Sequence, residues 1–227
     1  MSVLAFDTAT SATVVAVAAA DGALLAESRH DPAPGEKPGH GPQLLALCDR
    51  ALREADLGWR DVRRIGAGVG PGTFTGLRIG VATARALAQG LGVPVVPVDT
   101  LEALALGARD AGLDGPVLAV VDARRGEAFV AAWDADGRRL MEPAAWRPER
   151  LAEATNLDCG AWQAVGDGAV RFRESLEAAG VAVPADDDPV HRVAAGPLGR
   201  LAAEGPVVER DALVPRYVRA PDAKVRR

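Results

Sequence analysis

Lysine is nearly absent from this chain. Lys37 and Lys224 are the only lysines among 26 basic residues, and 31 acidic residues leave a formal net charge of -5. Proteins that bind nucleic-acid backbones unaided use clustered Lys and Arg side chains for it. The charge balance therefore argues against such a surface, and we expect a partner to hold any RNA that this protein acts on.

Cysteine and long apolar runs are also scarce. Cys48 and Cys159 lie far apart in the sequence, in helix-like and loop-like contexts, so no disulfide framework is expected. No stretch approaches the roughly 18 to 20 apolar residues of a membrane span. Met1 leads into a strand-like segment without a basic leader. We therefore expect a cytoplasmic protein with no membrane contact.

Metal ligands and nucleophiles are few. The histidines His30, His40 and His191 are isolated, with no pair three to five positions apart. No Gly-x-Ser-x-Gly segment is present, and Cys48 lies in an apolar helical pattern typical of a buried thiol. We predict no metal site and no protease nucleophile.

The apolar patterns predict an α/β protein with two similar halves, residues 1–99 and 100–227. Predicted strands of the first half cover 3–6, 12–19, 24–28, 65–69 and 93–98, and its helices cover 43–57 and 77–91. Predicted strands of the second half cover 117–121, 127–133, 138–142 and 162–165, and its helices cover 100–111, 148–154, 170–179 and 194–204. Thr100 is the expected N-cap of the helix over 100–111.

Four landmarks recur at an offset of 115 positions. Asp7, Gly22, Leu25 and Glu27 match Asp122, Gly137, Leu140 and Glu142. Each set follows the order strand, Asp, strand, Gly-turn, strand, which indicates a duplicated unit, with chance alignment of common residues as the alternative.

The most distinctive segment is the glycine loop, residues 70–80, with the sequence Gly-Pro-Gly-Thr-Phe-Thr-Gly-Leu-Arg-Ile-Gly. Glycines allow a backbone to approach an anion, and a helix N-terminus attracts one. However, no Lys-Ser or Lys-Thr pair follows at the Walker spacing, and no window completes the dinucleotide pattern. We predict a tight strand-to-helix turn capped by Thr73 or Thr75 rather than a phosphate cradle.

Two acidic turns suggest a nucleotide cleft between the halves. Asp7 and Asp122 each end the first strand of a half, where a carboxylate could hold hydrated magnesium. The hydroxyls of Thr8 and Thr10 could donate to phosphate oxygens. The first turn has no glycine before Gly22, which weakens this hypothesis, and bracing of the turn is an equal alternative.

Gly166 and Gly168 follow a predicted strand, at a place where adenosine could sit in such a cleft. Glycines at strand-to-helix turns more often serve backbone geometry. The sequence therefore outlines a weak, degenerate nucleotide cleft. We expect no required cofactor, and weak or interface-shared binding of ATP or ADP stays open.

Three segments resemble the bacterial TsaB (YeaZ) family: Leu-Ala-Phe-Asp-Thr-Ala-Thr at 4–10, the glycine loop, and Asp-Ala-Arg-Arg-Gly-Glu at 122–127. Residues 215–219 resemble the family's ending. The resemblance implies a duplicated actin-like ATPase (ribonuclease H-like) fold. It also implies a non-catalytic subunit that helps to form threonylcarbamoyladenosine beside the anticodon of tRNA. Such a subunit pairs with its catalytic paralogue TsaD, with the ATPase TsaE, or with itself, and it meets tRNA only through the complex.

The resemblance further implies that pairing uses the helices over 43–57 and 77–91, although covering a sheet is the alternative for either helix. Small side chains in the second helix let helix axes approach closely. The expected interface residues are Leu44, Leu45, Cys48, Leu52, Thr75, Ile79, Ala82 and Ala86. The TsaD metal motif, His-x-x-x-His, is incomplete here, because His40 is followed four positions later by Leu44.

Two other functions stay open. One is an active actin-like enzyme, an ATP-dependent kinase or carbamoyltransferase, with Asp7 and Asp122 around magnesium ATP. The other is a peptidase, a label given to relatives of the family, for which no nucleophile or metal set can be assembled here.

Overall fold

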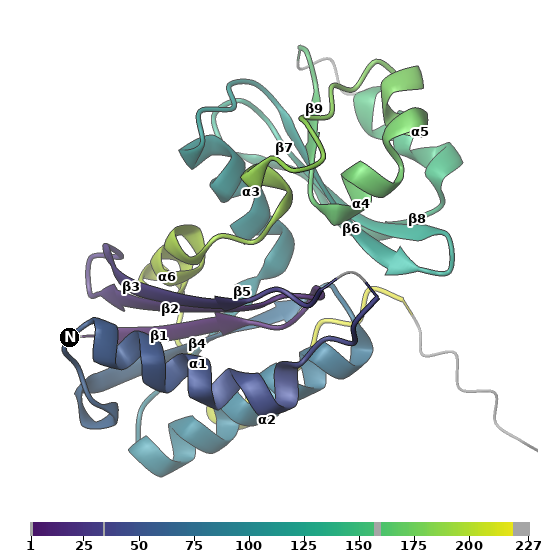
Figure 1. Ribbon diagram of the computed structural model, residues 1–227. Helices are drawn as coiled ribbons and strands as arrows, with labels where there is room; N and C mark the ends of the chain where they lie inside the picture. The colour runs from purple at the N-terminus through teal and green to yellow at the C-terminus, as the bar shows by residue number, and fades with distance from the viewer. Residues whose placement is uncertain (1, 34, 157–159, 220–227) are drawn as a thin grey trace, which may run out of the picture.

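Two α/β halves are stacked on each other in a computed structural model that describes residues 2–33, 35–156 and 160–219 (Figure 1). Cys159 and Lys224 lie outside these ranges. The first sheet has the order β3-β2-β1-β4-β5, in which β1 pairs antiparallel with β2 and parallel with β4. Its strands are β1 (Ser2–Asp7), β2 (Thr13–Ala19), β3 (Leu24–His30), β4 (Val62–Gly70) and β5 (Val95–Asp99).

The second sheet repeats the first four positions of this order, as β8-β7-β6-β9. Its strands are β6 (Val117–Arg124), β7 (Glu127–Trp133), β8 (Arg139–Trp146) and β9 (Gln163–Val165). The two hairpin glycines, Gly22 and Gly137, both have φ of 83°, the left-handed conformation that glycine adopts without a steric penalty. The offset of 115 positions therefore marks equivalent turns in two copies of one unit.

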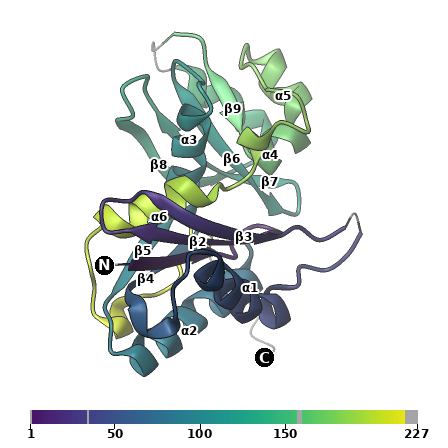
Figure 2. The same cartoon turned by 60° about the vertical axis from the view of Figure 1, so that its left-hand side comes forward.

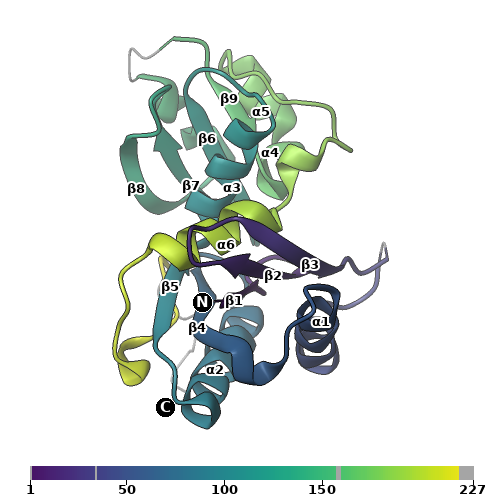
Figure 3. The same cartoon turned by 90° about the vertical axis from the view of Figure 1, so that its left-hand side faces the viewer.

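One face of the first sheet is covered by α1 (His40–Glu54) and α2 (Phe74–Leu91), as Figure 3 shows. In α1 the buried apolar residues recur at helical spacing, which turns one face to the sheet. They are Leu44, Leu47, Cys48, Ala51 and Leu52, all 5% exposed or less. The helix begins at His40, three residues before the predicted start, with Pro42 in the first turn where proline is tolerated.

The helices α3 (Thr100–Asp110) and α6 (Ala195–Glu204) lie between the two sheets (Figure 2). Small residues let α6 pack closely on the first sheet: a Cβ at Gly199 would lie 3.0 Å from that of Ala18, and a Cβ at Gly66 would overlap Ala202. The chain thus returns to the first half through α6. The proposed boundary between residues 1–99 and 100–227 falls between β5 and α3. However, α6 belongs to the second range and packs on the first sheet.

Several predicted helices differ in detail. The helix over 170–179 is split into α4 (Asp167–Arg171) and α5 (Arg173–Ala178) by Phe172, whose φ is -108°. Residues 148–154 belong to a 3-10 segment, Pro148–Asn156. The N-cap of α3 is Asp99 rather than Thr100. The Asp99 carboxylate accepts hydrogen bonds from the backbone N–H groups of Leu101 and Glu102, which have no acceptor within the helix.

The end of the described chain connects both halves. Leu213 is fully buried in the core beneath α1 and α2. The Arg216 N–H donates to the Val69 carbonyl at 2.8 Å, and the Arg219 guanidinium donates to Glu127 on β7 at 2.7 Å. Residues 213–219, here called the strap, therefore tie β4 to the second sheet. Among the described residues, no helix is both long and apolar enough to span a bilayer.

Candidate functional site

A cleft of about 230 Å³ lies between the halves. Thr10 and Ser11, from the turn after β1, line it together with Asp167 of α4, Asp186 and His191. Of the residues predicted to contact a nucleotide, only Thr10 lines this cleft; Asp7, Thr8, Asp122, Gly166 and Gly168 are not part of its lining. Those five residues instead make contacts within the protein.

Asp7 is enclosed at the end of β1. One carboxylate oxygen accepts from the Ala9 N–H and the other from the Thr100 hydroxyl, both at 2.7 Å. Burial raises the pKa of this carboxyl, although the hydrogen bonds from Thr100 and Ala9 act in the opposite direction. A Cβ at Gly68 would lie 2.0 Å from the same carboxylate. Asp7 is thus packed against β4 with both oxygens in use.

Thr8 connects the first turn to the glycine loop. It is fully buried, and its hydroxyl donates to the Gly76 carbonyl at 2.8 Å. A Cβ at Gly80 would lie 2.4 Å from the same hydroxyl oxygen, and a Cβ at Gly76 would lie 1.9 Å from the Thr8 carbonyl oxygen. Real Cβ atoms do not approach this closely, so both positions require glycine for this packing.

Gly72 and Thr73 complete the contact between the glycine loop and the first turn. A Cβ at Gly72 would lie 2.3 Å from the Ala9 carbonyl oxygen, and the Thr73 N–H donates to that oxygen at 2.7 Å. Thr73 is the N-cap of α2 by backbone conformation, without a side-chain capping bond. Thr75 lies inside the helix and is exposed. The loop therefore wraps around residues 8–9 and positions α2.

Asp122 is held by two arginines. Its side chain is 6% exposed and accepts from the guanidinium groups of Arg124 at 3.0 Å and Arg171 at 2.9 Å, while the Arg124 N–H also donates to it at 2.8 Å. Arg124 can reach back because its φ is 63°, at a bulge in the pairing of β6 with β7. A carboxylate saturated in this way has little capacity left to hold a hydrated cation.

Gly166 and Gly168 serve close backbone packing. Gly166 has φ of 107°, and a Cβ there would lie 2.1 Å from the Val120 carbonyl oxygen. A Cβ at Gly168 would lie 2.8 Å from the Val121 carbonyl carbon. Between them, Asp167 accepts from the Asp122 N–H at 3.0 Å, and burial raises the pKa of the Asp167 carboxyl. The pair thus fixes α4 against β6.

His40, His191 and Cys48 lie in separate parts of the fold. His40 is buried, with Nδ1 2.8 Å from the Thr13 hydroxyl, and burial lowers its pKa. The Gly166 N–H donates to His191 Nδ1 at 3.2 Å. Burial raises the pKa of the Cys48 thiol to about 12, so no thiolate forms there near neutral pH. Within residues 2–33, 35–156 and 160–219, no three His, Cys, Asp or Glu side chains gather as metal ligands would.

The predicted interface residues divide into two groups. Leu44, Cys48 and Leu52 are 1% exposed or less and pack α1 onto the sheet, so the protein's own core covers them. Ile79 is half-buried against the same core. The other four lie at the surface: Leu45, which is 51% exposed, and Thr75, Ala82 and Ala86 along α2.

Sequence reasoning missed an aromatic pair beside this surface. Phe74 and Tyr217 stack with ring centroids 5.4 Å apart, and they are 46% and 43% exposed. The Arg78 guanidinium lies 3.8 Å from the Phe74 ring centroid and donates to the Tyr217 hydroxyl at 3.1 Å. Phe74 and Arg78 are four positions apart and so share a helix face, but only the fold brings Tyr217 to them.

Comparisons with known proteins agree with this architecture. Residues 36–173 match the family model described as TsaD: tRNA N6-adenosine threonylcarbamoyltransferase. The chain is 34% identical over 172 residues to the tRNA threonylcarbamoyladenosine biosynthesis protein TsaB of Escherichia coli, covering 74% of this chain and 72% of that protein.

Solved structures add the fold. YeaZ from Pseudomonas aeruginosa is similar with a TM-score of 0.79 and 30% identity, over 95% of this chain and 99% of that one. A ROK hexokinase from Thermus thermophilus has a TM-score of 0.51 at 18% identity, over 89% and 98% of the two chains, a likeness of fold alone. The predicted duplicated actin-like fold is confirmed.

Proposed function

The chain belongs to the TsaB (YeaZ) family, whose members are tRNA threonylcarbamoyladenosine biosynthesis proteins, and we propose that it is the non-catalytic, activating subunit of the complex. In this role it pairs with a TsaD-like catalytic paralogue and acts together with a TsaE-like ATPase. It meets tRNA only within the assembly, works in the cytoplasm, and can also pair with itself.

The observation that supports this proposal most is the state of the two acidic turns. In an actin-like enzyme these carboxylates would be free to organise a magnesium nucleotide. Here both oxygens of Asp7 accept hydrogen bonds inside the protein, and Asp122 is held by two arginines. We propose that the chain needs no cofactor of its own, and that any ATP or ADP is weakly bound or shared across an interface.

The exposed side of α2 supports the pairing. Ala82 and Ala86 are one turn apart and both exposed, so their small side chains let a partner helix approach closely. Leu45 on α1 adds an exposed apolar side chain. Burial of such surface is worth about 25 cal/mol per Å² before ordering costs are subtracted. Leu44, Cys48 and Leu52 support the surface from below.

Co-purification with the TsaD-like partner tests the proposal. We expect the wild-type chain to form a stable complex that restores threonylcarbamoylation of a tRNA transcript. Ala82→Arg and Ala86→Glu should weaken association at least about tenfold, because each places a charge in a close helix contact, while circular dichroism shows the monomer still folded.

Ala178→Arg is the matched control. Ala178 ends α5 in the second half and is exposed, so the same added charge should leave association unchanged. Failure of the wild-type chain to pair with the partner would contradict the proposed function. ATP turnover by the isolated chain, abolished by Asp122→Ala, would favour the kinase or carbamoyltransferase alternative instead.

A further inference from the structure

Arginines from both halves lie on one side of this otherwise acidic protein. Arg124 and Arg125 occupy the turn between β6 and β7, Arg147 follows β8, and Arg171 ends α4. Arg219 of the strap and Arg78 of α2 complete the group, here called the arginine arc. We propose that the arc is a phosphate-binding surface for RNA in the assembled complex, an inference that rests on the proposed function.

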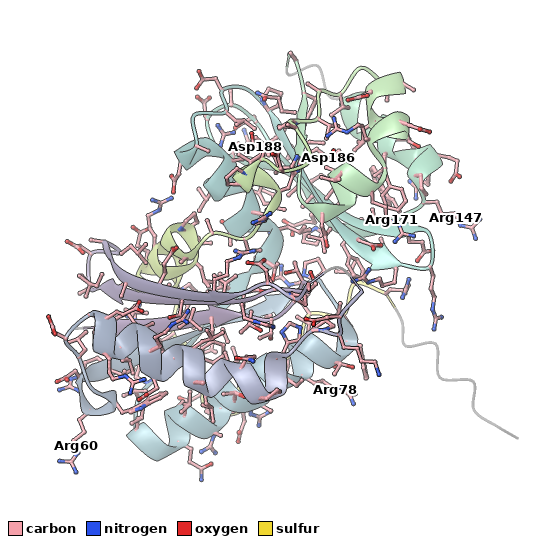
Figure 4. All side chains as sticks on the ribbon, viewed as in Figure 1. Arg60, Arg78, Arg147, Arg171, Asp186 and Asp188 are labelled. Atoms are coloured by element: carbon pink, nitrogen blue, oxygen red, sulfur yellow. The ribbon has the colours of Figure 1, made fainter. Side chains whose placement is uncertain are left out.

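The sheet register brings the members of the second half together. Arg124 pairs with Glu127 across the β6–β7 hairpin, and Trp146 pairs with Ala128 on the other side of β7. Arg147, the next residue, therefore emerges at the same edge of the sheet as the β6–β7 turn. Figure 4 shows Arg147 and Arg171 on one side of the molecule and Arg78 on the same side of the first half.

The strap links this edge to the first half. Arg219 donates to Glu127 at 2.7 Å. Two residues earlier, Tyr217 accepts the hydrogen bond from Arg78 at 3.1 Å. The strap therefore connects the edge of the second sheet, where the β6–β7 turn and the end of β8 lie, to the N-terminal part of α2.

Four arginines of the arc keep their guanidinium groups accessible. Two of its arginines share one carboxylate, Asp122, yet their side chains stay 55% and 47% exposed. Arg147 is exposed and forms no ion pair with any described residue. Arg78 is likewise exposed, and its contacts are to the aromatic pair. Guanidinium groups held in this manner still present N–H donors to phosphate oxygens.

The aromatic pair distinguishes an RNA surface from a merely basic one. Unstacked bases bind by stacking on aromatic side chains and on guanidinium planes, and phosphates bind to neighbouring basic groups. Phe74 and Tyr217 present half-exposed rings with Arg78 beside them. An exposed Arg–aromatic cluster beside a row of arginines fits single-stranded or looped RNA better than it fits an apolar partner.

Salt-dependent binding of an unmodified tRNA transcript tests this inference. The complex of this chain with its TsaD-like partner is titrated by fluorescence anisotropy between about 50 and 200 mM salt. Combining Arg147→Glu with Arg171→Gln should weaken binding about tenfold, and the slope of log K against log salt should fall by about 1 for each lost phosphate contact. Tyr217→Ala should weaken binding about fivefold through lost stacking.

Arg60→Glu is the matched control. Arg60 is exposed, forms no ion pair with a described residue, and lies at the far end of the first half (Figure 4). The Arg60→Glu variant should leave the affinity for the tRNA transcript and the slope of log K against log salt unchanged. Equal losses for Arg60→Glu and the arc variants, or no loss for the arc variants, would overturn the inference while complex formation and activity still upheld the proposed function.

Association with the partner is measured in parallel. If the arc variants weaken pairing with the TsaD-like partner and leave RNA affinity intact, the arc is a protein-docking surface and the inference is wrong. If the wild-type complex does not form at all, the proposed function fails first, and the inference fails with it.

Discussion

The Thr8 hydroxyl donates a hydrogen bond of 2.8 Å to the carbonyl oxygen of Gly76, 68 residues later in the chain. This contact joins the turn after β1 to the first turn of α2, in a place where a Cβ on Gly76 or Gly80 has no room. The glycines of the glycine loop, taken alone, would suggest a phosphate-binding loop. In the structure the loop instead packs against the protein's own backbone. It fixes the position of the helix that presents Ala82 and Ala86.

Gly76→Ala should destabilise the fold by about 3 kcal/mol, because the new Cβ would overlap the Thr8 carbonyl and force the turn and α2 apart. Gly90 lies in the same helix, and a Cβ added there would have nothing within 4 Å. Gly90→Ala should therefore stabilise by about 0.5–1 kcal/mol. Urea unfolding of both variants measures the difference, and equal effects would refute the packing of the loop on the turn.

Asp7→Asn should flatten the dependence of stability on pH. The pKa of Asp7 is raised by burial above the 3.8 of an unfolded chain. The folded state therefore holds this proton more tightly, and the stability it contributes is fully present below pH 3.8 and is lost as the pH rises through the folded pKa. Asparagine does not titrate, so the free energy of unfolding of the Asp7→Asn variant should fall less than that of the wild type as the pH rises through this range.

Urea titrations at a series of pH values measure this dependence. Asp187→Asn, at an exposed aspartate, controls for the change in net charge and should follow the wild-type profile. A profile for Asp7→Asn that is parallel to the wild type would show that the Asp7 carboxyl is not desolvated as described.

Cys48 should resist alkylation in the native protein. Its thiol is fully buried and its pKa is raised to about 12, so the reactive thiolate is absent and the reagent cannot reach it. In a Cys159→Ser background, mass spectrometry should find no iodoacetamide adduct at about pH 8, just below the pKa of a free thiol, until urea unfolds the chain. Rapid labelling of the folded protein would reopen the peptidase alternative.

Arg216→Gln should loosen the strap. Arg216 donates to the Asp99 carboxylate at 2.7 Å, and Arg139 donates to the same carboxylate at 3.1 Å. Because the Arg216 side chain is 47% exposed, screening limits the expected loss of stability to about 1 kcal/mol. The Arg216 amide, which donates to Val69, should exchange its hydrogen faster. Arg210→Gln, in an exposed pair with Asp211, should change neither quantity.

Much of the fold follows from local sequence signals. The Asp-Gly turns at Gly22 and Gly137 and the apolar runs around them fix both hairpins, because a short glycine-containing turn between two buried strands leaves few alternatives. Cap positions were harder. Asp99 and Thr100 are both good N-cap residues. The Thr100 hydroxyl donates to Asp7, and Asp99 is the residue that caps α3.

The candidate site was harder to predict from the sequence, since the roles of its residues depend on contacts between segments that are far apart in the chain. Asp7 ends β1, as predicted, whereas Asp122 lies two residues before the end of the equivalent strand, β6. No sequence pattern reveals that Thr100 and Arg171 occupy the oxygens of these carboxylates. Similarly, the apolar stripe of α1 is visible in sequence, whereas the division between buried Cys48 and exposed Leu45 depends on where the sheet lies. The Phe74–Tyr217 stack needed the strap to return to α2.

Threonylcarbamoyladenosine formed on a tRNA transcript, quantified by mass spectrometry in a reconstituted reaction with the TsaD-like and TsaE-like partners, tests the account most directly. We predict that product formation requires this chain, survives Asp122→Asn in a folded protein, and is lost with Ala82→Arg. Full activity with Ala82→Arg, together with loss of activity in a folded Asp122→Asn variant that still pairs, would contradict a subunit that acts through its helices rather than through its own acidic turns.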